Sequence, residues 1–218
     1  MEQPDTAPGP RVATIGRGTA RATPDAALLA LEVWAELDTP EAALDEVARR
    51  TTALTVVLDR AGIPAHARST AGVSLTERWE YRHDEQVFVG YRASTVVSVR
   101  ITDLATTGRV ISEATRDAQA RPHGPSWQVD PENPARAEAC RVAAADARRK
   151  AEAYADALGL RLGAVLSIRE PGARPRPIEP QQAVMRMAGG GGPDMPVESG
   201  DVGVSAAVTV VFELLTID

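Results

Sequence analysis

Few residues of the types that carry out catalysis occur in patterns that would let them act together. The chain has one cysteine, Cys140, and three scattered histidines, His66, His83 and His123, whose spacing matches no metal-ligand motif. A nucleophilic cysteine requires a histidine base and an orienting partner, whereas Cys140 occupies a small-residue position of a predicted helix and is expected to be a buried core thiol. A lone cysteine also forms neither an intramolecular disulfide nor a thiolate metal cage. We therefore predict a protein that is not an enzyme and has no catalytic, cofactor-binding or metal-binding residues.

Two glycine-containing segments share only part of the known phosphate-binding motifs. Gly16-Arg-Gly18 lacks the third glycine of a dinucleotide fingerprint, since Arg21 occupies that place and a strand rather than a helix follows. We interpret this pair of glycines as a bulge or kink in an edge strand. The glycine run 189–192 is not followed by the Lys-Ser/Thr of a phosphate loop. Its methionine-rich surroundings make the loop 181–196 a candidate for an adaptable binding segment.

The best candidate for a functional surface is a group of aromatic and arginine side chains near the tip of a predicted hairpin. Its members are Trp79, Tyr81, Arg82, Phe88 and Tyr91. Such side chains form cross-strand pairs, are enriched at subunit contacts, or stack on sugars and bases. We predict cross-strand pairing together with a subunit contact. The alternative is a small-ligand or carbohydrate-binding module that uses the hairpin 78–91 or the loop 181–196.

Composition and charge exclude several classes of protein. With 44% hydrophobic and 25% charged residues among 218, the chain is neither disordered throughout nor embedded in a membrane. A formal net charge of −6 argues against a general nucleic-acid binder. No apolar run approaches the roughly 20 residues of a membrane helix, so we expect no membrane insertion. The acidic, proline-containing N-terminus does not resemble a secretory signal, which predicts a cytoplasmic protein.

Hydrophobic periodicity predicts an α+β fold in which helices cover one mostly antiparallel sheet, in the order β-β-α-β-β-α-β-α-β-β. The strands are expected at 11–15, 26–37, 67–82, 86–101, 126–129, 160–170 and 202–217, and the helices at about 40–61, 103–116 and 134–158. The last strand is expected to close the sheet. We predict a disordered tail at 1–10 and a single domain at 11–218, with a flexible Pro/Gly/Met-rich loop at 171–200.

Two periodic patterns predict which side chains share one face of a strand or helix. Along 26–37, apolar residues alternate with Glu32, Trp34 and Glu36, which should share the opposite face of the sheet. Along the third helix, an alanine-rich stripe is expected to pack on the sheet. The residues assigned to this stripe are Cys140, Ala144, Ala147, Ala151, Tyr154, Ala155 and Leu158.

The third helix and the strand after it contain a recognisable pattern, Ala143-Ala-Ala-Asp146-Ala147-Arg-Arg-Lys150-Ala151-Glu152, Leu158-Gly159 and Gly163-x-Val165. Further short motifs occur along the chain, in the order Gly16-x-Gly18, Pro24-Asp25, Ala61-Gly62-Ile63, Gly90-Tyr91-x-Ala93 and Gly200. Together these residues resemble the SIMPL-domain family, which includes bacterial periplasmic immunogenic proteins. The likeness covers about residues 11–216. It implies an α+β fold, self-assembly into ring- or channel-like homo-oligomers in some members, and links to oxidative or envelope stress. It supplies no catalytic residues.

From the residues and this resemblance together we expect a non-enzymatic, self-assembling protein with a scaffold or stress-protection role. Many relatives carry a signal peptide, and the departure of this sequence from that pattern agrees with the cytoplasmic prediction.

Overall fold

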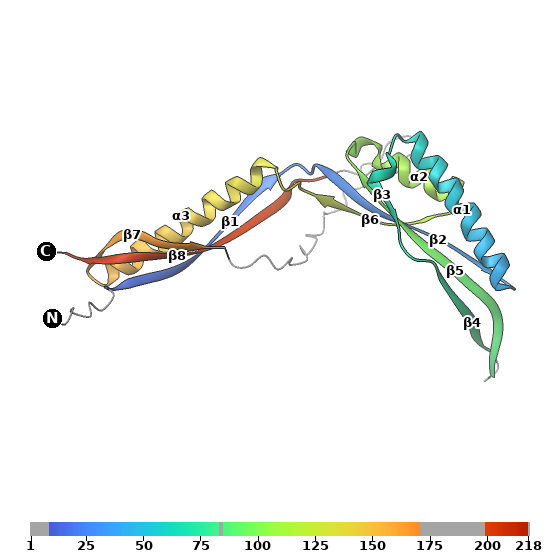
Figure 1. Cartoon of the computed structure of the whole chain (residues 1–218), viewed down its shortest axis with the longest axis horizontal. Helices are drawn as coiled ribbons and strands as arrows, with labels where there is room; N and C mark the ends of the chain where they lie inside the picture. The colour runs from blue at the N-terminus through green and yellow to red at the C-terminus, as the bar shows by residue number, and fades with distance from the viewer. Residues whose placement is uncertain (1–8, 83–84, 171–198, 218) are drawn as a thin grey trace, which may run out of the picture. The chain divides into compact units, whose positions relative to one another are not determined.

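The computed structural model describes residues 9–82, 85–170 and 199–217. Most of the predicted tail 1–10, nearly all of the predicted loop 171–200 and the whole candidate binding loop 181–196 lie outside these residues. The described chain is α+β with antiparallel sheets, as predicted (Figure 1). The elements in chain order are β1 Arg11–Ala22, β2 Ala26–Leu37, α1 Pro40–Arg60, β3 Arg68–Thr70, β4 Ser74–Arg82, β5 Glu85–Ile101, α2 Thr107–Ala118, β6 Arg121–Gln128, α3 Pro134–Ala157, β7 Leu160–Arg169 and β8 Val202–Thr216.

The element order agrees with the sequence pattern apart from one strand. The first strand of the predicted hairpin is divided into β3 and β4, and both pair with β5. Between them the chain stays attached to β5, because Ala71 N–H donates to Val96 O at 2.8 Å and Thr95 Oγ1 donates to Ala71 O at 3.2 Å. A break in the ladder therefore separates two strands that the alternation alone joins.

The described chain divides into two compact units, each with its own sheet. Residues 24–82 and 85–128 form the five-stranded unit, with the order β3-β5-β2-β6 and β4 on β5. Residues 9–23, 129–170 and 201–217 form the three-stranded unit, with the order β1-β8-β7. The expectation of one continuous sheet is wrong, because β8 pairs along its length with β1 and β7.

In the five-stranded unit, α1 and α2 cover one face of the sheet (Figure 1). α1 begins where Thr39 accepts a hydrogen bond from Ala42 N–H through its side chain, and Gly62 follows the helix with φ +74°. The core is built from branched apolar side chains. The largest that are fully buried in this unit are Leu29, Leu31, Val33, Leu54, Val57, Leu58, Val99, Ile101 and Val110.

In the three-stranded unit, α3 packs against β1 and β8 through alanines. Gly16 and Gly18 of β1 lie directly under the helix: a Cβ added at Gly16 would lie 1.9 Å from Ala143 O, and one at Gly18 would lie 2.2 Å from Ala139 O. β1 pairs with β8 in unbroken register from Arg11 to Ala22. The bulge interpretation of Gly16 and Gly18 is therefore wrong, since the two glycines make room for a helix backbone.

The buried stripe of α3 differs from the predicted one. It consists of Ala139, Ala143, Asp146, Ala147, Ala151 and Ala155. Cys140 is exposed rather than buried, and Tyr154 and Leu158 are exposed too. The physical reason is the close approach to β1, which leaves room for a methyl group but not for a thiol or a larger side chain.

The outer edge of β1 is bonded to α3 through side chains. Asp146 Oδ2 accepts a hydrogen bond from Arg17 N–H at 3.0 Å, and Lys150 Nζ donates to Ile15 O at 2.9 Å. Lys150 also lies 2.6 Å from Asp146 Oδ2. The hydrogen bond from Lys150, followed by that from the Arg17 amide, holds the pKa of the Asp146 carboxyl below its usual range. The helix thus occupies backbone groups that a strand edge otherwise offers to another chain.

Candidate functional site

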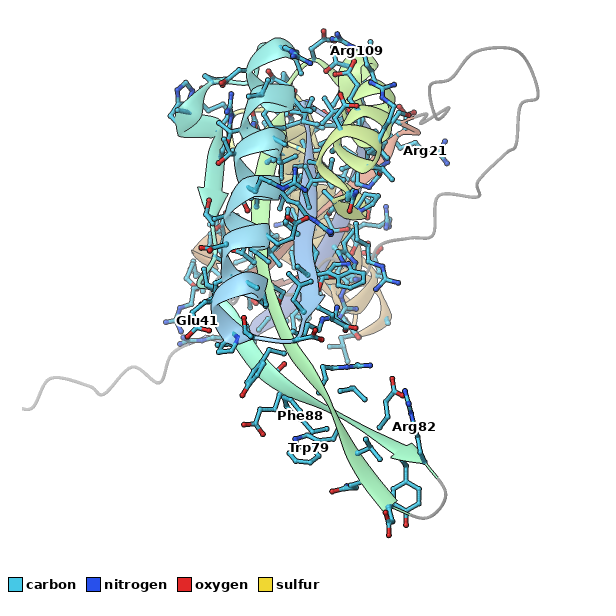
Figure 2. The ribbon with its side chains drawn as sticks, turned by 90° about the vertical axis from the view of Figure 1, so that its right-hand side faces the viewer. Arg21, Glu41, Trp79, Arg82, Phe88 and Arg109 are labelled. Carbon is cyan, nitrogen blue, oxygen red and sulfur yellow. The ribbon has the colours of Figure 1, made fainter. Side chains whose placement is uncertain are left out.

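The hairpin formed by β4 and β5 extends beyond the rest of its sheet (Figure 2). The pairing of β2 with β5 ends at Leu37 and Tyr91, so residues 85–90 pair only with β4 among the described strands. A two-stranded ribbon is marginally stable in water by itself. This ribbon therefore combines weak internal support with a large accessible surface.

Three of the five predicted site residues form an aromatic cluster on one face of this ribbon. Trp79 lies opposite Phe88 in the register, with ring centroids 5.3 Å apart at 68°, and Phe88 meets Tyr91 at 5.2 Å and 71°. Both contacts are edge-to-face, a favourable arrangement for aromatic rings. Trp79 is nevertheless 53% exposed and Phe88 40% exposed. The predicted cross-strand pairing is present, and much of the aromatic surface faces solvent.

A β-bulge brings Tyr91 to the same face as Phe88. The register shifts between Arg78, opposite Gly90, and Trp79, opposite Phe88. Residues three apart on a regular strand point to opposite faces, and the extra residue cancels that difference. Gly90 has φ +126°, and a Cβ there would lie 2.7 Å from Leu37 O. Glycine is thus required at the bulge that completes the cluster.

The other two predicted residues lie apart from these ring contacts. Tyr81 is 71% exposed, opposite Gln86 near the end of the ribbon. Arg82, which Figure 2 labels on this ribbon, follows Tyr81 on the opposite face. Its guanidinium pairs with Glu80 at 2.7 Å. The prediction therefore grouped residues from two faces of one hairpin.

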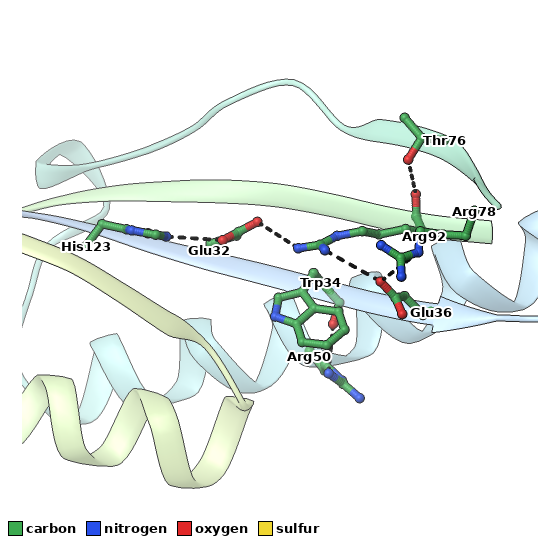
Figure 3. Close-up of polar contacts among 8 residues, drawn as sticks. All are labelled: Glu32, Trp34, Glu36, Arg50, Thr76, Arg78, Arg92 and His123. Atoms are coloured by element: carbon green, nitrogen blue, oxygen red, sulfur yellow. Dashed lines mark hydrogen bonds and ion pairs between the residues drawn. The ribbon is translucent and has the colours of Figure 1, made fainter. Parts of the chain in front are cut away.

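A second polar constellation, not singled out by the sequence analysis, lies on the face of the five-stranded sheet opposite the helices (Figure 3). The Arg92 guanidinium lies 4.8 Å from the centroid of the Trp34 ring and 3.5 Å from carboxylate oxygens of both Glu32 and Glu36. His123 Nε2 lies 3.1 Å from the other oxygen of Glu32. The alternation in β2 did place Glu32, Trp34 and Glu36 on one face, but Arg92 is supplied by β5.

The back of this constellation is attached to α1. Arg50 donates a hydrogen bond to Trp34 O at 2.7 Å and pairs with Glu46 at 2.7 Å. Hydrogen bonds from Arg49 and Arg50 lower the pKa of Glu46 to about 2. The carboxylates of Glu32, Glu36 and Glu46 all have cationic partners, an arrangement suited to holding these side chains in place.

The described residues contain neither a metal-binding cluster nor a membrane-spanning helix. No group of three or more His, Cys, Asp or Glu side chains in the described part of the chain is placed to hold a metal ion. Among the helices at 40–60, 107–118 and 134–157, none has the length and apolar character needed to cross a bilayer.

Comparison with known sequences assigns the chain to a protein family. The SIMPL family model, described as a protein of unknown function (DUF541), matches residues 12–212, and the chain belongs to this family. The match spans both compact units.

Individual relatives extend this assignment. The 26 kDa periplasmic immunogenic proteins of Brucella melitensis biotype 1 and Brucella abortus (strain S19) are each 31% identical over 94% of this chain and 84% of the relative. An uncharacterized protein, YggE, of Edwardsiella ictaluri is 28% identical over 74% of this chain and 68% of the relative. The Brucella names contradict the predicted cytoplasmic location, because both proteins are named as periplasmic.

Proposed function

We propose that this protein is a non-enzymatic, self-assembling member of the SIMPL family that acts in the periplasm as a scaffold or in protection against oxidative or envelope stress. The observation that carries the proposal is the exposed aromatic cluster on the β4–β5 ribbon. Aromatic side chains supply large contact areas at subunit interfaces. Because a two-stranded ribbon is only marginally stable by itself, contact with a partner would stabilise it.

Measurement of native mass by multi-angle light scattering tests the assembly. The double variant Trp79→Ser/Tyr81→Ser removes two side chains that are 53% and 71% exposed, so the fold of the chain should be preserved. We expect the assembly to fall to smaller species. Tyr154→Ser, which removes an aromatic side chain 58% exposed on α3, is the matched control and should keep the native mass.

A strictly monomeric wild-type protein would refute self-assembly, and an unchanged mass of the double variant would refute the role of the ribbon. The stress role has its own test, in which the chain is produced in the periplasm of a bacterium that lacks it. Survival under peroxide should rise with the wild-type chain and less with the double variant. No gain in survival would leave a scaffold without a protective role.

The same aromatic cluster supports the alternative of a carbohydrate- or small-ligand-binding module, since exposed Trp and Tyr rings also stack on sugars. Titration of the wild-type protein with oligosaccharides separates the two. Saturable quenching of tryptophan fluorescence that is lost in Trp79→Ser, with native mass unchanged, would favour the binding module over the assembly. The other suggested binding segment, 181–196, lies outside the described residues.

A further inference from the structure

The face of the three-stranded sheet opposite α3 carries a concentration of positive charge. In antiparallel pairs, residues directly opposite each other point to the same face. The even-numbered residues of β1, such as Gly16 and Gly18, lie under α3, so the odd-numbered ones point away from the helix. The arginines on this open face are Arg11, Arg17 and Arg21 of β1 and Arg161 and Arg169 of β7, which lie opposite odd-numbered residues of β8.

These five arginines are exposed, and no ion pair with a carboxylate joins any of them within the described residues. Arginines of the other sheet are arranged differently: Arg92 and Arg78 on its open face both pair with Glu36. Glu213, opposite Arg11, is the one carboxylate among the described residues of the basic face. With five arginines and one glutamate, this face has a net positive charge, although the whole chain has a net charge of −6.

Apolar and small side chains separate the arginines. Ile15 is 52% exposed and Leu215 37% exposed on this face, and Ala13, Ala207 and Val211 point to the same side. Over the twelve residues of β1 the face extends roughly 40 Å. It presents a broad sheet surface with guanidinium groups around short apolar side chains.

We propose that this open face of the three-stranded sheet binds the surface of an anionic phospholipid bilayer. Each arginine close to such a surface contributes favourably, and clusters of four to eight basic residues are typical of anionic-lipid binding. Ile15 and Leu215 add apolar contact at the headgroup level, while the chain remains peripheral to the bilayer. This proposal is independent of the assembly proposed above.

The composition of the face disfavours other occupants. Its described residues include no aromatic side chain on which single-stranded bases would stack, and a broad sheet face does not enter a DNA groove as a helix or ribbon does. A two-fold contact between identical faces would place arginines against arginines, a costly arrangement. A bilayer matches both the extent of the face and the sign of its charge.

Vesicle co-sedimentation tests the proposal on the full chain. Wild-type protein should bind vesicles of equimolar phosphatidylglycerol and phosphatidylcholine, should be released by high salt, and should not bind phosphatidylcholine alone. The triple variant Arg17→Gln/Arg21→Gln/Arg169→Gln should bind about 100-fold more weakly, since each arginine contributes roughly fivefold. The matched control is Arg60→Gln/Arg109→Gln/Arg121→Gln, which removes the same charge from the five-stranded unit and should retain wild-type binding.

Circular dichroism and native mass accompany each variant, so that loss of fold or assembly is seen separately. Absence of wild-type binding to anionic vesicles would overturn the proposal, as would equal weakening in the two triple variants. A fall in native mass of the first triple variant would assign the face to a contact between copies instead. Tighter binding of an oligonucleotide than of anionic vesicles would assign it to nucleic acid.

Discussion

The two units of this chain solve helix–sheet packing in different ways. In the five-stranded unit, large side chains such as Leu29, Leu31 and Leu54 fill the space between sheet and helices. In the three-stranded unit, glycines of β1 meet alanines of α3, and hardly any side-chain volume separates the two backbones. The five-stranded unit is therefore sensitive to the removal of side-chain volume from its core. The three-stranded unit is sensitive to the addition of side-chain volume between helix and strand. Substitutions of opposite kinds should therefore damage them.

The largest effect is expected from adding one methyl group to the three-stranded unit. In Gly16→Ala the new Cβ would lie 1.9 Å from Ala143 O and 2.6 Å from Ala147 N, which are backbone atoms that cannot rotate away. We expect a loss of about 3–5 kcal/mol in the free energy of unfolding, at or above the upper end for overpacking. Hydrogen exchange should show deprotection first in α3 and β1.

Gly203→Ala is the matched control on β8, where the added Cβ meets only Thr19 Cγ2 at 3.6 Å. It should change unfolding by less than about 0.5 kcal/mol. If both variants have the same stability, the helix and strand are not held at the distance described.

Removing volume from the five-stranded unit should have the next largest effect. Leu31 is fully buried at the centre of β2, so Leu31→Ala should cost about 3 kcal/mol through lost burial and the cavity left behind. Chemical denaturation measures this loss, and hydrogen exchange should locate it in β2, β5 and α1. Leu44→Ala, at a position 37% exposed on α1, should cost less than about 1 kcal/mol. A larger loss at Leu44 than at Leu31 would contradict the assigned core.

The bonding between α3 and β1 predicts a pH dependence of the stability of the three-stranded unit. The folded-state pKa of Asp146 is lowered, chiefly by Lys150, so its carboxylate stabilises the fold above the unfolded pKa of about 3.9. That contribution should disappear as pH falls through the lower folded-state pKa. Asp146→Asn should therefore be less stable than wild type at neutral pH, by less than the core substitutions, and the difference should shrink in acid. Lys150→Met should reproduce part of it in pH-dependent thermal unfolding, and a difference that grows in acid would refute the assignment.

The smallest effect is expected on the open face of the five-stranded sheet. Arg92→Met removes ion pairs at 3.5 Å and the contact with the Trp34 ring. Such partly exposed interactions contribute little each, so the expected loss is about 1 kcal/mol or less. Arg92→Lys should recover part of it in thermal unfolding. A loss comparable to that of Leu31→Ala would show that this network, rather than the apolar core, dominates the unit.

Local patterns in the sequence predicted much of the fold. The alternation of Leu29, Leu31 and Val33 with Glu32 and Trp34 correctly assigned the two faces of β2, because a strand has a side-chain period of two. Thr39 and Gly62 correctly located the ends of α1, because caps act within one turn.

The features that could not be predicted from the sequence depend on contacts between residues far apart in the chain. Arg92 meets Glu32 across 60 positions, and the Arg17 amide meets Asp146 across 129 positions. No periodicity within one segment specifies the register of two others. The exposed Cys140 is a further example, since only the closeness of β1 decides which small residues of α3 are covered.

The backbone contact between α3 and β1 also limits how this sequence can vary. A large core tolerates exchanges among Leu, Ile and Met when total volume is kept, but no side chain is smaller than the hydrogen of Gly16 or Gly18. Tolerance to substitution should therefore be lowest where the side chains are smallest. A search pattern of two glycines spaced by one residue, followed far along the chain by alanines at steps of four, describes that constraint more directly than any aromatic or charged motif. In a library of random variants selected for folding, these positions should be the first at which only the wild-type residue remains.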